Sequence, residues 1–293
     1  RLEAGLYGTI ERGTWNAKVY NYNSERGIPG AIVNNVWRRG ERVWDTNSFF
    51  QGSFVKEVND QFKTQVNAKY AFYRTHYVNN DDKLIEVDNL YKQREVYVST
   101  ANMYTIFPFW DVSMSYDFQW NEMKADMYGF VFPTRFTNLL SIATALRLGK
   151  VKLQGSGLAT FVNDRVKEGP APKARQILTP AVFLSYKPFD KHDFSLRAFY
   201  KKTFRMPTFN DLYYADMGNS KLDPEYVTQY NLGTVYQKQW GNKLFRHFKI
   251  QADGYYNYVK DKIIAYPKGQ QFRWTMLNLG KVKIRGVDIS TET

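Results

Sequence analysis

The most regular feature of the chain is an alternation of apolar and polar residues over positions 110–120. Period two over eleven residues predicts a β-strand with two opposite faces. A strand of this length spans about 33 Å, and a tilt of about 40° gives a height of about 25 Å, the apolar band of a membrane barrel with aromatic rims. The apolar face carries Trp110, Val112, Met114, Tyr116, Phe118 and Trp120, and the polar face carries Asp111, Ser113, Ser115, Asp117 and Gln119.

The same alternation recurs along the chain and predicts about thirteen strands. They cover residues 2–10, 14–23, 44–57, 61–78, 91–105, 109–122, 136–148, 150–163, 175–187, 193–203, 226–239, 245–262 and 276–292. Short turns alternate with long connections at 23–43, 79–90, 121–135, 164–173, 203–225 and 265–273. No segment has a convincing amphipathic helix pattern. The predicted fold class is all-β, a transmembrane antiparallel up-and-down β-barrel.

The odd strand count bears on the extent of the barrel. An open sheet edge in lipid leaves unpaired backbone groups, so a membrane sheet must close on itself. Bacterial single-chain barrels have even strand numbers. The chain begins at Arg1 without Met and stops at Thr293 within a strand-like run. We therefore expect both ends to be truncated and the chain to be part of a longer protein.

Composition excludes several other classes of protein. Aromatic residues make up 17% of the 293 residues, mean hydropathy is −0.54, and no apolar run is long enough for a transmembrane helix. The absence of Cys excludes disulfides, zinc–thiolate sites and Cys nucleophiles. The net charge of +13 is best explained by solvated loops and lumen, and next by attraction to anionic headgroups or an acidic ligand. The basic residues form no compact stripe, so no nucleic-acid partner is expected.

Three late stretches of the chain carry short motifs that match one known protein family in order and spacing. Residues 203–214 read Thr-Phe-Arg-Met-Pro-Thr-Phe-Asn-Asp-Leu-Tyr-Tyr, like the family's Ser/Thr-Phe-Arg-x-Pro…Asp-Leu-Tyr segment. Leu-Asp-Pro-Glu at 222–225 precedes Gln-Tyr-Asn-Leu-Gly at 229–233, where Asn231 replaces a common acidic residue. Asn-Leu-Gly at 278–280 precedes Arg-Gly-Val-Asp at 285–288. These three stretches resemble the barrel of TonB-dependent outer-membrane receptors. The motif residues are Phe204, Arg205, Pro207, Leu212, Tyr213, Pro224, Glu225, Gly233, Asn278, Gly280 and Gly286, and we expect structural roles for them.

The resemblance implies a barrel of about 22 strands around an N-terminal plug. Residues 1–293 would then be the central part, about strands 4 to 16, with the plug and the final strands absent from this chain. Residues 25–31 and 93–120 look like members from Bacteroidetes-type bacteria. The implied location is the outer membrane of a Gram-negative bacterium. The implied partners are outer-membrane lipid, the TonB complex through the absent plug, and a small nutrient ligand.

The function implied by the resemblance is TonB-coupled uptake of a scarce nutrient, with a metal chelate such as a siderophore or cobalamin favoured. A glycan or haem importer of the same family stays open. A passive porin is the alternative from another class, although the motifs and long loops argue against it. An outer-membrane enzyme and a soluble β-domain adhesin are weaker alternatives.

Candidate binding residues lie in two predicted loops. Trp37, Arg38, Arg39 and Trp44 come from the first long connection, and Tyr213 and Tyr214 from the largest late one. Aromatic rings beside Arg at a barrel mouth can stack on and pair with an organic ligand. Girdle aromatics and loop packing are the more ordinary explanation. The residues expected to line the lumen are Lys63, Lys69, Asp111, Asp117, Lys249 and Asp253.

No catalytic, metal or cofactor site is expected. His76, His192 and His247 fall on elements that do not converge, and Asp111 and Asp117 stand about 20 Å apart along one strand, too far for a carboxylate pair. The acidic run at 79–82 offers two carboxylates where calcium needs at least six oxygen ligands, so a solvated turn is favoured. Pro207 lacks an N–H and is expected to end strand pairing at the start of a loop.

Overall fold

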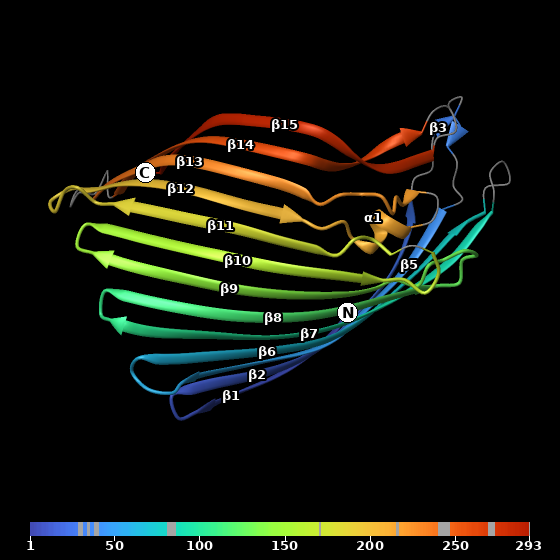
Figure 1. Ribbon diagram of the computed structural model, residues 1–293, viewed down its shortest axis with the longest axis horizontal. Coiled ribbons are helices and arrows are strands. Elements are labelled where there is room, and N and C mark those ends of the chain that lie inside the picture. The colour runs from blue at the N-terminus through green and yellow to red at the C-terminus, as the bar shows by residue number, and fades with distance from the viewer. Residues whose placement is uncertain are drawn as a thin grey trace.

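The protein is described here from a computed structural model covering residues 1–28, 32–33, 36–37, 41–80, 86–169, 171–214, 217–239, 247–268 and 273–292. Thirteen antiparallel strands pair in chain order in one sheet (Figure 1). They are β1 (Leu2–Ile10), β2 (Gly13–Ile28), β5 (Glu41–Glu57), β6 (Phe62–Asn79), β7 (Val87–Phe107), β8 (Trp110–Ala125), β9 (Thr134–Leu148), β10 (Val151–Arg165), β11 (Arg175–Tyr186), β12 (Asp193–Arg205), β13 (Glu225–Gln239), β14 (His247–Lys268) and β15 (Arg273–Glu292). A separate hairpin pairs β3 (Ile32–Val33) with β4 (Val36–Trp37).

The prediction of an all-β, up-and-down meander is confirmed, since each expected strand is present and pairs with its sequence neighbours. Several strands extend further at the long-connection end than the alternation predicts. For example, β5 begins at Glu41, β7 begins at Val87, and β14 ends at Lys268. The sequence pattern predicted no helix, and this prediction is wrong. One short helix, α1 (Phe209–Tyr213), lies between β12 and β13.

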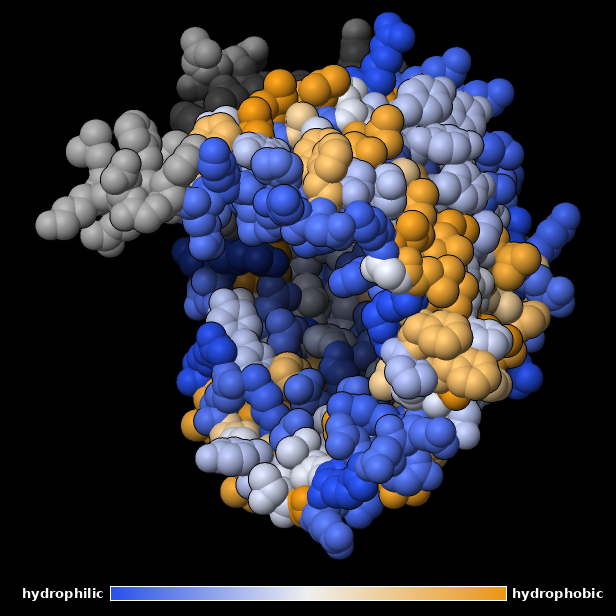
Figure 2. Space-filling model, turned by 90° about the vertical axis from the view of Figure 1, so that its left-hand side faces the viewer, coloured by the Kyte–Doolittle hydropathy of each residue, from blue (hydrophilic) through white to orange (hydrophobic). Residues whose placement is uncertain are grey.

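The sheet curls around a hollow but does not close, because β1 and β15 pair with no further strand among the described residues. Residues directly opposite each other in neighbouring strands share a face. Asp117 lies opposite Ser99, and Ser99 lies opposite Asn67, so these three residues define one face. Met114 and Tyr116, on the other face, are exposed. Figure 2 shows hydrophilic side chains lining the hollow and hydrophobic patches on the outside.

The two ends of the sheet differ in their connections. The short turns lie at one end, on the left of Figure 1, and the long connections with α1 lie at the other. No helix in the described part of the chain is long and apolar enough to cross a membrane. The largest cluster of buried apolar side chains lies at the long-connection end, beside α1.

Candidate functional site

The candidate site is the long-connection end of the hollow, where the segment between β12 and β13, residues 206–224, folds against the inner face. Phe209, Leu212 and Tyr213 of α1 pack with side chains from β7, β8 and β14. The buried members of this cluster are Tyr91, Met123, Ala125, Phe130, Phe209, Leu212, Tyr213, Leu222 and Ile263. The segment thus turns inward and narrows this end of the hollow.

A capping box begins α1 directly after the end of β12. The Thr208 hydroxyl accepts a hydrogen bond from the Asp211 N–H at 3.1 Å, and Asp211 Oδ2 accepts one from the Thr208 N–H at 2.9 Å. This reciprocal arrangement satisfies two N–H groups that a helix start leaves unpaired. Arg205 also donates to Asp211 Oδ2 at 3.1 Å, which ties the helix to the last residue of β12.

Arg135 anchors the start of the connection to the barrel wall. Its Nε and Nη2 donate to the two carboxylate oxygens of Asp164, each at 2.7 Å, and its Nη1 donates to the Pro207 carbonyl at 2.7 Å. The guanidinium carbon lies 5.2 Å from the centroid of the Phe209 ring. Arg135 and Asp164 are both buried. One side chain therefore joins β9, β10 and the connection through a bidentate pair, the strong form of such contacts.

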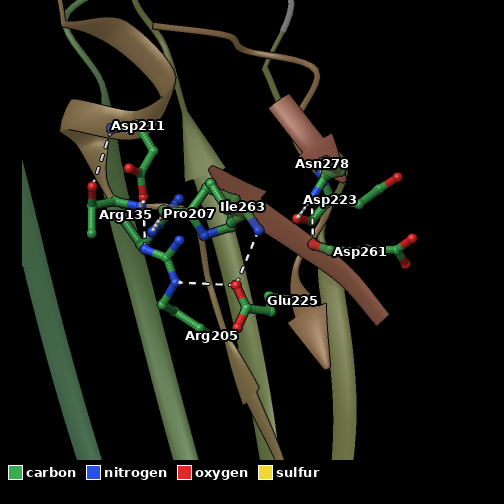
Figure 3. Close-up of polar contacts among 10 residues, drawn as sticks. Arg135, Arg205, Pro207, Asp211, Asp223, Glu225, Asp261, Ile263 and Asn278 are labelled. Carbon is green, nitrogen blue, oxygen red and sulfur yellow. Dashed lines mark hydrogen bonds and ion pairs between the residues drawn. The ribbon is translucent and has the colours of Figure 1, made fainter. Parts of the chain in front are cut away.

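A second anchor holds the end of the connection (Figure 3). Asn278 Oδ1 accepts from the Asp223 N–H at 2.9 Å, and Asn278 Nδ2 donates to the carbonyls of Asp223 at 3.0 Å and Asp261 at 2.7 Å. Glu225 Oε2 accepts from the Ile263 N–H at 3.0 Å and lies 3.8 Å from Arg205 Nε. Asp261 has a φ of 56°, at an irregularity where these bonds replace regular strand pairing.

Two glycines of the motif lie under side chains of the neighbouring strand. A Cβ at Gly233 would stand 2.0 Å from Asp253 Oδ1, and one at Gly286 would stand 2.4 Å from the Tyr255 hydroxyl. Arg197, Gly233 and Asp253 are consecutive partners across three strands, and Arg197 Nη2 lies 3.3 Å from Asp253 Oδ2. Gly233 therefore lets an ion pair form directly over it, between strands that are not neighbours.

Tyrosines form an aromatic group beside α1. Tyr214 stacks on Tyr91 with ring centroids 4.9 Å apart and meets Tyr77 edge-on at 6.5 Å. Burial raises the pKa of Tyr213 to about 12, with a smaller contribution from the charge of Asp164. Burial also raises the pKa of the Tyr214 phenol. Both phenols are neutral at physiological pH, so they add no negative charge to this part of the mouth.

The residues predicted for ligand binding do not all meet at this mouth. Tyr213 and Tyr214 lie in and next to α1. Trp44 lies on the outer face of β5, opposite His76, and its ring stacks on that of His76 at 5.3 Å. Trp37 ends β4, but its side chain, Arg38 and Arg39 lie outside the described residues. Ligand binding by any of these residues stays a prediction.

The six residues predicted to line the lumen all lie on the inner face. Each of them contacts a residue of another strand. Lys69 Nζ lies 2.9 Å from Glu95 Oε1, Asp111 Oδ2 lies 2.7 Å from Arg147 Nη2, Asp117 accepts from the Tyr97 hydroxyl, and Asp253 pairs with Arg197. Lys63 lies 3.4 Å from Glu57, and Lys249 lies 3.7 Å from Glu292. The inner face is therefore lined by paired charges, while a role for them in transport stays a prediction.

The three histidines lie on separate elements of the fold. His76 lies on β6, where its Nε2 stands 2.6 Å from Asp88 Oδ1, His192 lies in a short turn against Phe189, and His247 begins β14. Among the described residues, no group of three or more His, Asp or Glu side chains is placed to hold a metal ion. The run at 79–82 is described only for residues 79 and 80.

Sequence reasoning missed the pair Arg135 and Asp164, which organises the site. The alternation in β9 and β10 shows that both residues face inward, but nothing in it indicates which inward positions a loop covers. The start of α1 could have been predicted from the sequence, because Thr208 stands three residues before Asp211, which is the spacing of a capping box.

An open-ended antiparallel sheet with an apolar outer face, a polar inner face and an inward-folded connection defines an outer-membrane β-barrel wall. Residues 3–292 match the family model described as "TonB dependent receptor-like, beta-barrel", and the chain belongs to this family. This confirms the resemblance noted in the sequence, and it places the chain in the outer membrane of a Gram-negative bacterium. The likeness to Bacteroidetes-type members stays a prediction.

Among curated proteins, the chain is 34% identical over 87 residues to the "Vitamin B12 transporter BtuB" of Vibrio vulnificus (strain YJ016), covering 29% of this chain and 13% of that protein. Among solved structures, "Copper transporter OprC" matches 99% of this chain and 49% of its own, with a TM-score of 0.77 and 15% identity. The FrpB iron transporter from Neisseria meningitidis (F3-3 variant) matches the same shares with a TM-score of 0.73 and 12% identity. These structures show the fold alone, and the chain spans about half their length.

Proposed function

We propose that this chain forms part of the wall of an outer-membrane transporter that takes up a scarce nutrient with energy from the TonB complex. The observation that carries the proposal is the connection between β12 and β13, which two separate anchors hold against the inner face. A fixed inward segment above a polar inner face is suited to capturing a ligand and delivering it to the hollow. A passive pore does not need an inward segment that is held by two anchors.

The proposal includes parts that this chain does not contain. Residues 1–293 would be the central part of the barrel, and further strands would pair with β1 and β15, because an open edge in lipid leaves backbone groups unsatisfied. A plug inside the closed barrel would contact the TonB complex and rearrange when pulled. The inner-face residues Lys69, Asp117 and Asp253 would line the route of the ligand or contact the plug.

For the ligand we propose a metal chelate, such as a siderophore or cobalamin. The similar proteins support this choice, because their names specify vitamin B12, copper and iron. The partly exposed rings of Tyr77 and Tyr214 support an organic ligand with flat or apolar surfaces, since rings favour stacking. Haem and glycans remain the alternatives within the family.

The test is uptake by cells that carry the full-length protein. We expect cells lacking its gene to lose uptake of labelled cobalamin or of one ferric siderophore, and complementation to restore it. A protonophore should abolish the restored uptake. Uptake that persists with the protonophore would instead support a passive channel. Lys69→Ala should alter the uptake rate, while the matched control Lys191→Ala, in a short turn, should leave it unchanged.

A further inference from the structure

The outer surface of the barrel carries a basic cleft that the proposed transport function does not use. The cleft has a volume of about 540 Å³. Its lining residues are Glu122, Lys124, Phe132, Thr134, Arg165, Val166 and Lys167. We call it the outer basic cleft. It opens on the face opposite the one that Arg135 and Asp164 occupy, and two of its lining residues, Phe132 and Val166, also pack against the buried cluster beside α1.

The position of the cleft along the barrel follows from the strand register. Glu122 and Lys124 are the next two outward positions on β8 after Trp120, the rim aromatic at the long-connection end. At about 3.3 Å per residue and a tilt of about 40°, they lie about 5 and 10 Å above that ring. Met114 and Tyr116 follow below on the same outward row and are exposed. The cleft therefore lies at headgroup level, directly above surface that faces acyl chains.

The walls of the cleft are held in place by the fold. The Lys167 N–H donates to the Val131 carbonyl at 2.9 Å, which fixes the connection after β10 beside the connection after β8. Arg165 lies over the Phe136 ring with its guanidinium carbon 5.3 Å from the centroid, and Lys167 Nζ lies 5.5 Å from the centroid of Phe132. Two cations are thus positioned by aromatic rings rather than by carboxylates.

The charge of this surface is strongly unbalanced. Within the cleft, Glu122 is the one acid, and its carboxylate pairs with Lys124 at 3.3 Å. Lys92 and Arg94 on β7 stand opposite Lys124 and Glu122, and Arg74 on β6 stands opposite Lys92. None of Arg74, Lys92, Arg94, Arg165 and Lys167 forms an ion pair with another described residue. The surface therefore has several cations available for an external anion.

We propose that the outer basic cleft binds the phosphate of an anionic lipid headgroup in the leaflet that surrounds the long-connection end. Lys124, Arg165 and Lys167 contact the phosphate, and the acyl chains lie on the outward apolar row of β8. Each Lys or Arg near an anionic surface contributes about a factor of five to binding. The partner is a membrane lipid rather than a soluble anion, because cations and acyl-chain surface are continuous there.

The experiment measures lipid retained by the full-length protein after reconstitution into bilayers of neutral phosphatidylcholine with a minor fraction of phosphatidylglycerol or of bisphosphorylated lipid A. Native mass spectrometry counts the anionic lipids bound per protein. We expect the triple variant Lys124→Gln, Arg165→Gln and Lys167→Gln to lose retention about tenfold or more. The Glu122→Gln variant should increase retention, because it removes the only acid in the cleft.

The matched control is Lys150→Gln, Lys187→Gln and Lys191→Gln, which removes three charges at the short-turn end. It should retain as much anionic lipid as the unmodified protein. Equal losses in the two triple variants would overturn the proposal, since they would reflect net charge alone. Inorganic phosphate at millimolar concentration should not displace the lipid. Complete displacement by phosphate would also overturn it, by showing a site for a soluble anion.

Discussion

Two arginine–aspartate pairs on the same inner face show how differently one interaction can act. Arg135 and Asp164 lie under the inward-folded connection, with side chains 10% and 3% exposed and two contacts of 2.7 Å. Arg197 and Asp253 lie on the open inner wall, 42% and 18% exposed, at 3.3 Å. The first pair holds a loop and excludes water, while the second is part of a wetted lining. Burial, rather than the identity of the residues, decides the role.

The largest expected effect comes from breaking the buried pair. Asp164→Ala leaves the Arg135 guanidinium buried without its carboxylate, which costs about 3–5 kcal/mol. Urea unfolding of the full-length protein in detergent should show this loss of stability. Hydrogen exchange should show faster exchange of the α1 amides. Unchanged exchange in α1 would mean that Arg135 does not hold the connection.

The second largest effect on stability is expected from a charge placed on the outward face of β8. Met114→Arg places a charge on the outward face at mid-strand, and should cost about 2–4 kcal/mol of barrel stability. Ser115→Arg, one residue further on, points to the hollow and should cost much less. Folding titrations in lipid vesicles compare the two variants. Equal costs would contradict the assignment of faces.

A smaller effect is expected at the glycine beneath the exposed pair. The overlap of a Gly233→Ala methyl group with Asp253 should cost about 1–3 kcal/mol. Asp253→Ala alone should cost less than about 1 kcal/mol, because the pair is exposed and screened. In the double variant the cost of Gly233→Ala should largely disappear. A double-mutant cycle of unfolding free energies measures this coupling, and additive costs would contradict the steric explanation.

The smallest effect is expected at Tyr213, whose buried hydroxyl has no hydrogen-bond partner among the described residues. Tyr213→Phe should change stability by less than about 1 kcal/mol, because no bond is lost. The folded phenol has a pKa of about 12 against 10 in the unfolded chain. The unfolded state therefore releases its proton first, and stability falls as pH rises from 10 to 12. Absorbance titration of phenolate, compared with Tyr213→Phe, should identify this late group.

Most of the fold could be predicted from the alternation of apolar and polar residues, because each strand must present an apolar face to lipid and a polar face to the hollow. The strand ends were harder to predict. Glu41 and Lys268 lie above the apolar band, where contact with lipid no longer selects the outward residues. The alternation gave no indication of the contact between Arg135 and Pro207, which are 72 residues apart. Such contacts depend on how a connection folds back, and no local periodicity records this.

The anchors of the connection have a consequence for how the protein can diverge. Arg135 binds the carbonyl of Pro207, and Asn278 binds the N–H and carbonyl of Asp223, so the wall holds main-chain atoms at both ends of the segment. Nearly every residue type offers the same main-chain atoms. Substitutions between the two anchors can therefore accumulate without loosening either one. Descendants of one ancestral barrel can therefore change the sequence of this segment while their walls stay the same.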